Sequence, residues 1–202
     1  MIKTVAHLAD IHIRKTPTRN EEYQQVFKRL ITSLKKEKPD RIVIVGDLVH
    51  DYLDLQGEQL IMAHNLLQDL VAIAPVRITR GNHDCRKKNL KRVDSIKAIV
   101  ETLGDVDVIY YDKTGFFVDD DVTWAVWHHG EPKNNPWKSK EGKKILINKE
   151  QDSQTYIDLF HETVSGSQNQ NGLINKSKSF YGKEDFKGDF SFFGHIHKQQ
   201  YL

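Results

Sequence analysis

The residues of this chain that could do chemistry are gathered in five short motifs. Each motif contains an aspartate or a histidine, and three of them also contain a glycine. In chain order they are Asp10-Ile11-His12, Gly46-Asp47-Leu48-Val49-His50, Gly81-Asn82-His83-Asp84, His161, and Gly194-His195-Ile196-His197. Carboxylate, imidazole and amide groups together are ligands for divalent metals such as manganese, iron or zinc. No cysteine belongs to a motif, which argues against a structural zinc site.

The spacing within the motifs predicts that their side chains converge. In an extended segment, residues two apart point to the same side, so Asp10 with His12, and His195 with His197, can each meet at one place. The glycines permit sharp turns and close approach of the backbone. A Gly-Asn-His-Asp tetrad is expected by chance about once in a thousand chains of this length, and a Gly-His-x-His motif lowers that chance by roughly another hundredfold. The combination therefore predicts a functional site.

Apolar runs before the motifs predict an alternating order of strands and helices in the first half of the chain. The predicted strands cover Thr4–Ala9, Arg41–Val45 and Val76–Thr79. The predicted helices run from a capping box at Thr18 and Glu21 to Pro39, from about Leu55 to Ala72, and from Asp94 to near Gly104. This order implies parallel strands. The motifs lie at the carboxyl ends of these strands, where ligands bind in parallel sheets.

The second half of the chain is predicted to contain more strands and few helices. The predicted strands cover Val106–Tyr111, Phe116–Val118, Val122–Trp127, Tyr156–Phe160 and Phe190–Phe193. The run Asp119-Asp120-Asp121 between two of them predicts a hairpin. Two stretches, Glu131–Gln154 and Thr163–Gly188, are predicted to be long loops, and loops of that length in a compact domain are usually functional or mobile.

The composition is that of a globular protein with a net charge of +2. A length of 202 residues favours one domain. No apolar run approaches the ~18 residues that span a bilayer, and Met1–Val5 leads directly into a strand, so we expect neither a membrane segment nor a signal peptide. The single cysteine, Cys85, fits a reducing compartment, and we expect the protein in the cytoplasm. Five basic residues that follow the tetrad could contact the phosphates of a nucleic acid: Arg86, Lys87, Lys88, Lys91 and Arg92.

Taken together, the five motifs resemble those of the calcineurin-like metallophosphoesterase superfamily over residues 5–197. The resemblance implies an α/β fold, a four-layer α-β-β-α sandwich of two mixed sheets, and a centre with two divalent metal ions. One ion would be held by Asp10, His12 and His197, the other by Asn82, His161 and His195, with Asp47 bridging the pair. His83 would contact the scissile phosphate or protonate the leaving group. In this arrangement Asp84 could orient His83, and His50 could assist at the phosphate.

Two motifs are similar, more narrowly, to those of SbcD-type nucleases of DNA repair and recombination, a group that includes phage enzymes. They are Gly46-Asp47-Leu48-Val49-His50 and Ile157-Asp158-Leu159-Phe160-His161-Glu162. Protein Ser/Thr phosphatases have a Gly-Asp-x-Val-Asp-Arg-Gly pattern that this chain lacks. The resemblance implies a DNA exonuclease or endonuclease that uses Mn²⁺, with Mg²⁺, Fe²⁺ or Zn²⁺ as alternatives. It also implies a homodimer and an SMC-like ATPase partner, SbcC in bacteria.

The chain ends five residues after His197, whereas SbcD-type nucleases continue into a DNA-capping domain and an ATPase-binding tail. We therefore expect residues 1–202 to form a single nuclease domain, and the ATPase partnership stays open. Two apolar faces on the helix over Leu55–Ala72 favour one face for the core and one for a dimer.

Three alternatives remain at the level of the sequence. The enzyme could act on a small molecule or a phosphoprotein, or the chain could be a scaffold without catalysis. For the fourth motif, the pattern favours His161, but His128 or His129 could take its place.

Overall fold

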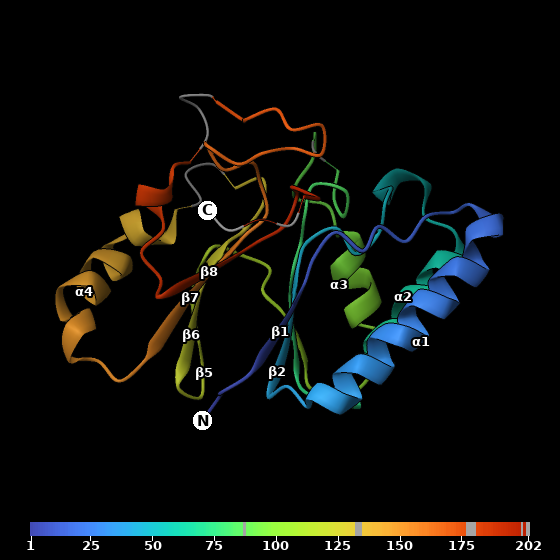
Figure 1. The fold of residues 1–202 in the computed structure, drawn as a ribbon, viewed down its shortest axis with the longest axis horizontal. Coiled ribbons are helices and arrows are strands. Elements are labelled where there is room, and N and C mark those ends of the chain that lie inside the picture. The colour runs from blue at the N-terminus through green and yellow to red at the C-terminus, as the bar shows by residue number, and fades with distance from the viewer. Residues whose placement is uncertain (87, 132–134, 177–180, 199, 201–202) are drawn as a thin grey trace.

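The computed structural model describes residues 1–202 except 87, 132–134, 177–180, 199 and 201–202. Within this part of the chain, two four-stranded sheets stand side by side between helices (Figure 1). Helices α1, α2 and α3 flank one sheet, and helix α4 lies outside the other. This arrangement is the expected α-β-β-α sandwich.

The first sheet is parallel, in the order β1-β2-β3-β4. Its strands are β1 (Val5–Leu8), β2 (Arg41–Val45), β3 (Val76–Thr79) and β4 (Val108–Tyr110). The helices between them are α1 (Asn20–Glu37), α2 (Gly57–Val71) and α3 (Ser95–Val100). Every residue from Ile42 to Val45 is fully buried, as expected for a strand covered on both faces. The predicted order and strand positions are confirmed in this half.

The second sheet is mixed, in the order β5-β6-β7-β8. Its strands are β5 (Gly115–Asp119), β6 (Val122–Trp127), β7 (Thr155–Phe160) and β8 (Phe190–Phe193). Strands β5 and β6 form the predicted hairpin, and Asp120 at its turn has a φ of 55°. The pairs β6-β7 and β7-β8 are parallel. Both sheets therefore direct strands toward a common edge.

An apolar layer joins the inner faces of the two sheets. Val43 and Val45 of β2 pack in one cluster with Trp124, Val126 and Leu159 of the second sheet. Separate apolar clusters lie under the outer helices. One includes Leu66, Leu67 and Leu70 of α2. In the other, Ile145 of α4 packs against Trp127 of β6 and Phe160 of β7. None of the helices in the described residues is both long and apolar enough to cross a membrane.

The prediction of one long loop over Glu131–Gln154 is wrong. Its described residues contain α4 (Lys140–Asn148) between the short 3₁₀ turns Pro136–Lys138 and Lys149–Gln151. Ser139 begins α4 by accepting a hydrogen bond from the Gly142 amide at 2.9 Å. A side chain at Gly142 would collide with the backbone of Trp137, 2.6 Å from its Cα. Packing thus requires a glycine that weakens the helical pattern in the sequence.

A second correction concerns the start of α1. The expected capping box at Thr18 and Glu21 is not formed, because a 3₁₀ turn over Pro17–Arg19 comes first and Arg19 precedes the helix without a side-chain cap. The other 3₁₀ turns are Tyr52–Asp54 and Lys183–Asp185, and the latter lies in the segment Thr163–Gly188, whose described residues contain no longer helix and no named strand.

Asp119 fastens the two sheets together at the end opposite the motifs. Its carboxylate accepts two hydrogen bonds of 2.9 Å from Arg41 of β2. It accepts two more, of 2.9 and 3.0 Å, from Arg77 of β3, and one of 3.1 Å from Trp124. Burial raises the pKa of Asp119, but these hydrogen bonds and charges outweigh burial and hold the pKa well below its usual range.

We predict that Asp119→Asn lowers the free energy of unfolding by about 3 kcal/mol, because the buried Arg77 and the partly buried Arg41 each lose one of their two carboxylate partners. Since the pKa of Asp119 is lower in the folded chain, its stabilisation is complete above about pH 4 and is lost as the pH falls further. Urea unfolding at pH 7 and pH 3 measures both effects. Asp120→Asn is the matched control. The exposed carboxylate of Asp120 pairs with Arg41 at 2.8 Å, and an exposed ion pair should contribute about 1 kcal/mol or less. If both variants lost the same free energy of unfolding, Asp119 would not be the residue that joins the two sheets.

Candidate metal centre

The sequence motifs meet at the carboxyl ends of five strands. Asp10 and His12 follow β1, Asp47 and His50 follow β2, and the tetrad Gly81–Asp84 follows β3. His161 comes directly after β7, and His195 and His197 follow β8. Because β1–β3 belong to one sheet and β7–β8 to the other, the centre lies where the two sheets face each other.

The first cluster of possible metal ligands consists of Asp10, His12 and His197. Their ligand atoms all lie within 4.8 Å of one another. His12 Nε2 is 3.0 Å from His197 Nε2, and Asp10 Oδ1 is 3.9 Å from His12 Nε2 and 3.8 Å from His197 Nε2. One carboxylate and two imidazoles facing a common point can hold a divalent cation.

The second cluster consists of Asp47, His161 and His195, again within 4.8 Å of one another. Asp47 Oδ2 lies 3.1 Å from His161 Nε2, and His195 Nδ1 lies 2.7 Å from Asn82 Oδ1. The same oxygen of Asp47 is 3.6 Å from His12 Nε2 of the first cluster. Asp47 therefore lies between the two clusters, as a bridging carboxylate must.

The surroundings of His161 test whether these residues fit a cation. The ring is buried, and its Nδ1 donates a hydrogen bond of 2.7 Å to the Val45 carbonyl oxygen. In the neutral ring Nε2 therefore carries a lone pair, and it has no hydrogen-bond partner among the described residues. Two electron-rich atoms, this nitrogen and Asp47 Oδ2, face each other at 3.1 Å. A divalent cation would satisfy both, so the residues fit a metal.

The pKa values of the cluster residues agree with this interpretation. Burial lowers the pKa of His12 and of His195 to about 4, so both rings are neutral at pH 7, as metal ligands require. Burial also acts on Asp47, but the contacts with His161 and with the His83 amide outweigh it and lower the pKa of Asp47 to about 2. His161 differs, because the Asp47 carboxylate outweighs burial and raises its pKa: without a cation a proton on Nε2 is favoured, and a bound cation would take the place of that proton. The carboxylates thus attract positive charge.

Three glycines from different motifs surround the His161 ring and leave room for it. A Cβ on Gly81 would lie 2.5 Å from His161 Nε2, and a Cβ on Gly194 would lie 3.1 Å from His161 Cε1. Gly46 also borders the ring, and its φ of 75° favours glycine in its own right. The glycines in the motifs are required chiefly by this close packing around a buried imidazole.

The convergence of the first cluster has a different cause from the expected one. Asp10 and His12 do not form an extended pair, because both have left-handed backbones with φ of 54° and 51°. Asp47 and His195 also have positive φ, of 54° and 79°. Such conformations cost about 1–3 kcal/mol each and are found at functional sites. Hydrogen bonds from the backbone offset the cost, among them His12 N to Asp47 O at 2.9 Å and His195 N to Asp10 Oδ2 at 2.9 Å.

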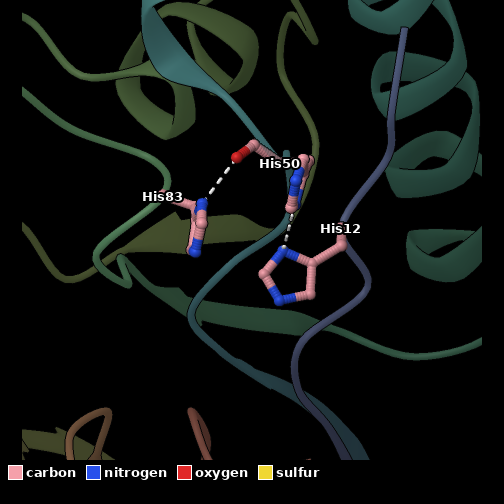
Figure 2. A group of neighbouring side chains, drawn as sticks. All are labelled: His12, His50 and His83. Atoms are coloured by element: carbon pink, nitrogen blue, oxygen red, sulfur yellow. Dashed lines mark hydrogen bonds between the residues drawn. The ribbon is translucent and has the colours of Figure 1, made fainter. Parts of the chain in front are cut away.

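His50 and His83 stand beside the first cluster (Figure 2). His83 Nδ1 donates to the His50 carbonyl oxygen at 2.6 Å, which leaves its Nε2 for the cleft. The rings of His50 and His83 are stacked, with centroids 4.9 Å apart. His50 Nδ1 lies 3.3 Å from His12 Nδ1. When Nε2 of His12 holds a cation, its Nδ1–H donates to His50, and the proton of His50 is then on Nε2.

The expected contact between Asp84 and the His83 ring is not formed. Asp84 is fully buried, and its oxygens accept hydrogen bonds from the amides of Asp47 at 2.7 Å, Gly81 at 2.8 Å and Val49 at 3.1 Å. Burial and the nearby charge of Asp47 raise the pKa of Asp84 to about 7. Asp84 therefore positions the loops that carry Asp47 and Asn82, rather than the ring of His83.

The structure separates His161 from the two alternative histidines of the fourth motif. His128 is buried with its Nε2 3.3 Å from the Tyr110 hydroxyl, and His129 Nδ1 lies 3.0 Å from Glu162 Oε1. Among the three, it is His161 that lies in a cluster with Asp47 and His195. His129 is nevertheless close, with its ring centroid 6.4 Å from that of His161.

Sequence reasoning missed Arg80, which joins the tetrad loop to the second sheet. Its buried guanidinium pairs with Asp94 at 3.1 Å and donates twice, at 3.2 and 3.0 Å, to the His129 carbonyl oxygen. Asp94 also accepts a hydrogen bond of 2.6 Å from Tyr110. The sequence did offer a signal for this role, because Arg80 is a charged residue placed directly between the buried strand β3 and Gly81.

The predicted DNA-contacting residues divide into three sets. Arg86 and Lys88 line a cleft of about 550 Å³ together with one acidic residue and six others: Asp51, His50, Tyr52, Leu53, Asn82, His83 and Cys85. Lys91 and Arg92 are exposed and do not line this cleft. Lys87 lies outside the described residues. The cleft therefore joins basic side chains to the two histidines beside the metal clusters.

Comparisons with known proteins extend over nearly the whole chain. A sequence model described as calcineurin-like phosphoesterase matches residues 3–199. Uncharacterized protein R555 of Acanthamoeba polyphaga mimivirus is 32% identical over 206 residues, which cover 100% of this chain and 15% of that protein. DNA double-strand break repair protein Mre11 of Methanopyrus kandleri is 24% identical over 205 residues, which cover 96% of this chain and 44% of that protein. The chain thus spans less than half the length of either relative.

Among solved structures, the crystal structure of Pseudomonas putida nuclease MPE aligns with a TM-score of 0.41 and 16% sequence identity. The alignment covers 84% of this chain and 66% of that one.

We predict that His161→Ala removes one of two Mn²⁺ equivalents in a calorimetric titration, because the second cluster loses its buried imidazole. Loss of a residue outside the ligand set typically weakens metal affinity by about 10–100-fold and keeps the stoichiometry. His129→Ala is the matched control and should retain two equivalents. If His129→Ala bound one Mn²⁺ equivalent and His161→Ala bound two, His129 would be the ligand instead of His161.

Proposed function

We propose that this chain, which belongs to the calcineurin-like phosphoesterase family of metal-dependent phosphoesterases, hydrolyses phosphodiester bonds of DNA. One observation carries the DNA specificity: Arg86 and Lys88 line the same cleft as His50 and His83. Cations at that place can neutralise the phosphates next to the scissile one. The name of the Mre11 relative, a DNA double-strand break repair protein, supports the same assignment.

In this proposal two divalent ions, with Mn²⁺ as the first candidate, supply the charge that stabilises the attacking and leaving oxygens of the phosphate. The first ion would be held by Asp10, His12 and His197. The second would be held by Asn82, His161 and His195, and Asp47 would contact both. Among these ligands, the neutral rings of His12 and His195 and the ionised Asp47 are already in the protonation states that such binding needs.

His83 and His50 are the groups that would act on the phosphate. Because Nδ1–H of His83 donates to the His50 carbonyl oxygen, its Nε2 faces the cleft; in the imidazolium form, which carries a proton on both nitrogens, the Nε2 proton can be given to the leaving oxygen. His50, with its proton on Nε2, can donate a hydrogen bond to a non-bridging phosphate oxygen. Asp84 would contribute by fixing the loops of Asp47 and Asn82.

We predict that the wild-type chain digests linear DNA in the presence of Mn²⁺ and that His83→Ala slows digestion by about 10²–10⁴-fold, the usual contribution of a general acid. End-labelled single- and double-stranded DNA and gel electrophoresis provide the measurement. His64→Ala is the control, since His64 lies on α2 and hydrogen-bonds to Thr102 at 3.0 Å.

Two other outcomes would replace the proposal. Intact DNA together with hydrolysis of bis-p-nitrophenyl phosphate would favour an enzyme for small molecules or phosphoproteins. A chain that binds no Mn²⁺ in calorimetry would favour a scaffold without catalysis.

We further predict that the double variant Arg86→Ala/Lys88→Ala has a flatter salt dependence of DNA binding. Each phosphate contact contributes a slope of about 0.7–0.9 in a plot of log K against log salt concentration, so two lost contacts should reduce the slope by roughly 1.4–1.8. Fluorescence anisotropy between 50 and 200 mM salt measures it. Lys35→Ala/Lys36→Ala, on the exposed end of α1, removes the same charge and should leave the slope unchanged. Equal slopes for both double variants would contradict the assignment.

A further inference from the structure

A second hollow adjoins the metal centre on the side of His195 and His197. It has a volume of about 370 Å³ and is lined by Asn169, Gln170, Asn171, His195, Ile196 and His197. Its three amide residues belong to none of the five sequence motifs. They lie in the segment after β7, drawn in orange in Figure 1, which passes over the carboxyl ends of the strands. This amide hollow shares no lining residue with the cleft of Arg86 and Lys88.

The amide residues are carried by a hairpin over residues 166–175 that supplies its own hydrogen bonds. The Asn169 amide donates to the Leu173 carbonyl oxygen at 3.0 Å, and the Gly172 amide donates back to Asn169 at 3.0 Å. Below the tip, Gly166 N donates to Asn175 O at 2.8 Å. Gly172 has a φ of 87°, a conformation that glycine adopts without cost. The backbone of the hairpin, together with a hydrogen bond of 2.8 Å from the Gln168 side chain to the Gly172 carbonyl oxygen, thus holds the tip in place.

The hairpin is also fastened to the segment that follows His197. The Gln200 side chain accepts a hydrogen bond from the Gln168 amide at 2.8 Å and donates to the Gln168 carbonyl oxygen at 2.8 Å. Lys198 donates to the side-chain oxygen of Gln168. The position of the amide hollow is therefore tied to the position of a metal-cluster residue.

The chemistry of the amide hollow differs from that of the basic cleft. No lysine, arginine, aspartate or glutamate is among its described lining residues, whereas Arg86 and Lys88 line the other side. Asn and Gln side chains offer donors and acceptors together, which suits the edge of a nucleobase better than a phosphate. Asn169 Oδ1 is buried and has no hydrogen-bond partner among the described residues, so a rotation of the Asn169 side chain toward the hollow would let it accept from a ligand N–H without breaking a hydrogen bond of that oxygen.

From these contacts we infer that the amide hollow is a nucleobase subsite, which binds the base of a nucleotide adjoining the scissile phosphate on the side away from Arg86 and Lys88. This inference rests on the proposed DNA hydrolysis. Asn169 and Asn171 hydrogen-bond to the edge of that base, while the basic cleft holds the phosphates on the other side. Cleavage at a given linkage then depends on the presence of a base at one neighbouring position only.

Abasic interference tests the subsite. A single abasic nucleotide is moved stepwise through an end-labelled single strand, and Mn²⁺-dependent cleavage of each linkage is read from the ladder. For the wild-type chain we expect about 10-fold slower cleavage at the one linkage with the abasic position on the amide side. Asn169→Ala/Asn171→Ala should cleave intact DNA about 10-fold more slowly and lose the interference. Hydrolysis of bis-p-nitrophenyl phosphate, which has no base, should be unchanged.

The matched control is Asn148→Ala, which removes an amide from α4 and should keep the wild-type interference pattern. If wild-type DNA cleavage shows no abasic interference, or if the double variant keeps it, the subsite is wrong while the nuclease assignment stands. If the wild-type chain cleaves no DNA, the proposed function and the subsite fail together.

Discussion

The mutual approach of Asp10 and Asp47 at the meeting edge of two sheets is the constraint on which the rest of the structure depends. Both carboxylates lie against His161, at 3.8 and 3.1 Å from its Nε2. Burial and the charge of Asp47 raise the pKa of Asp10, against the neighbouring histidines, which lower it. Charges of one sign cannot be held together in a partly dehydrated place without a counter-charge. A pair of divalent cations would supply it, and this need accounts for imidazoles, rather than lysines or arginines, between the carboxylates.

The scaffold must oppose that repulsion from several directions. The Asp84 carboxylate accepts hydrogen bonds from the amides of Asp47, Val49 and Gly81. Arg80 joins the tetrad loop to the second sheet through the His129 carbonyl oxygen. At the far end, Asp119 binds arginines from two strands of the first sheet. Except for the bond between Asp84 and Gly81, which lies within the tetrad loop, each of these contacts crosses between loops or sheets. The relative position of the two metal clusters is thus fixed by polar contacts that join separate parts of the chain, in addition to the apolar layer between the sheets.

Strand positions and the grouping of the motifs could be predicted from the sequence because they depend on local signals. Ile42–Val45 is a short apolar run that Gly46 and Asp47 terminate, and burial of a parallel strand follows from that pattern. The left-handed backbones of Asp10 and His12 could not be predicted, since neither residue is a glycine and the conformation depends on hydrogen bonds to a distant loop. The role of Asp84 was missed for the same reason. Its partners lie up to 37 residues away, while His83, the expected one, is its neighbour.

The residues of the metal clusters explain cleavage of a phosphoester but give little selectivity, because carboxylates and imidazoles are directed at the ions. Selectivity has to come from side chains just outside the clusters, and these differ on the two sides. Arg86 and Lys88 follow the tetrad in sequence and carry charge, which attracts any polyanion. The hairpin over 166–175 carries amides, which discriminate by hydrogen-bond geometry instead. Under the proposed function, a bound strand would therefore have a preferred direction across the metal centre, and that direction would be determined by loops rather than by the catalytic motifs.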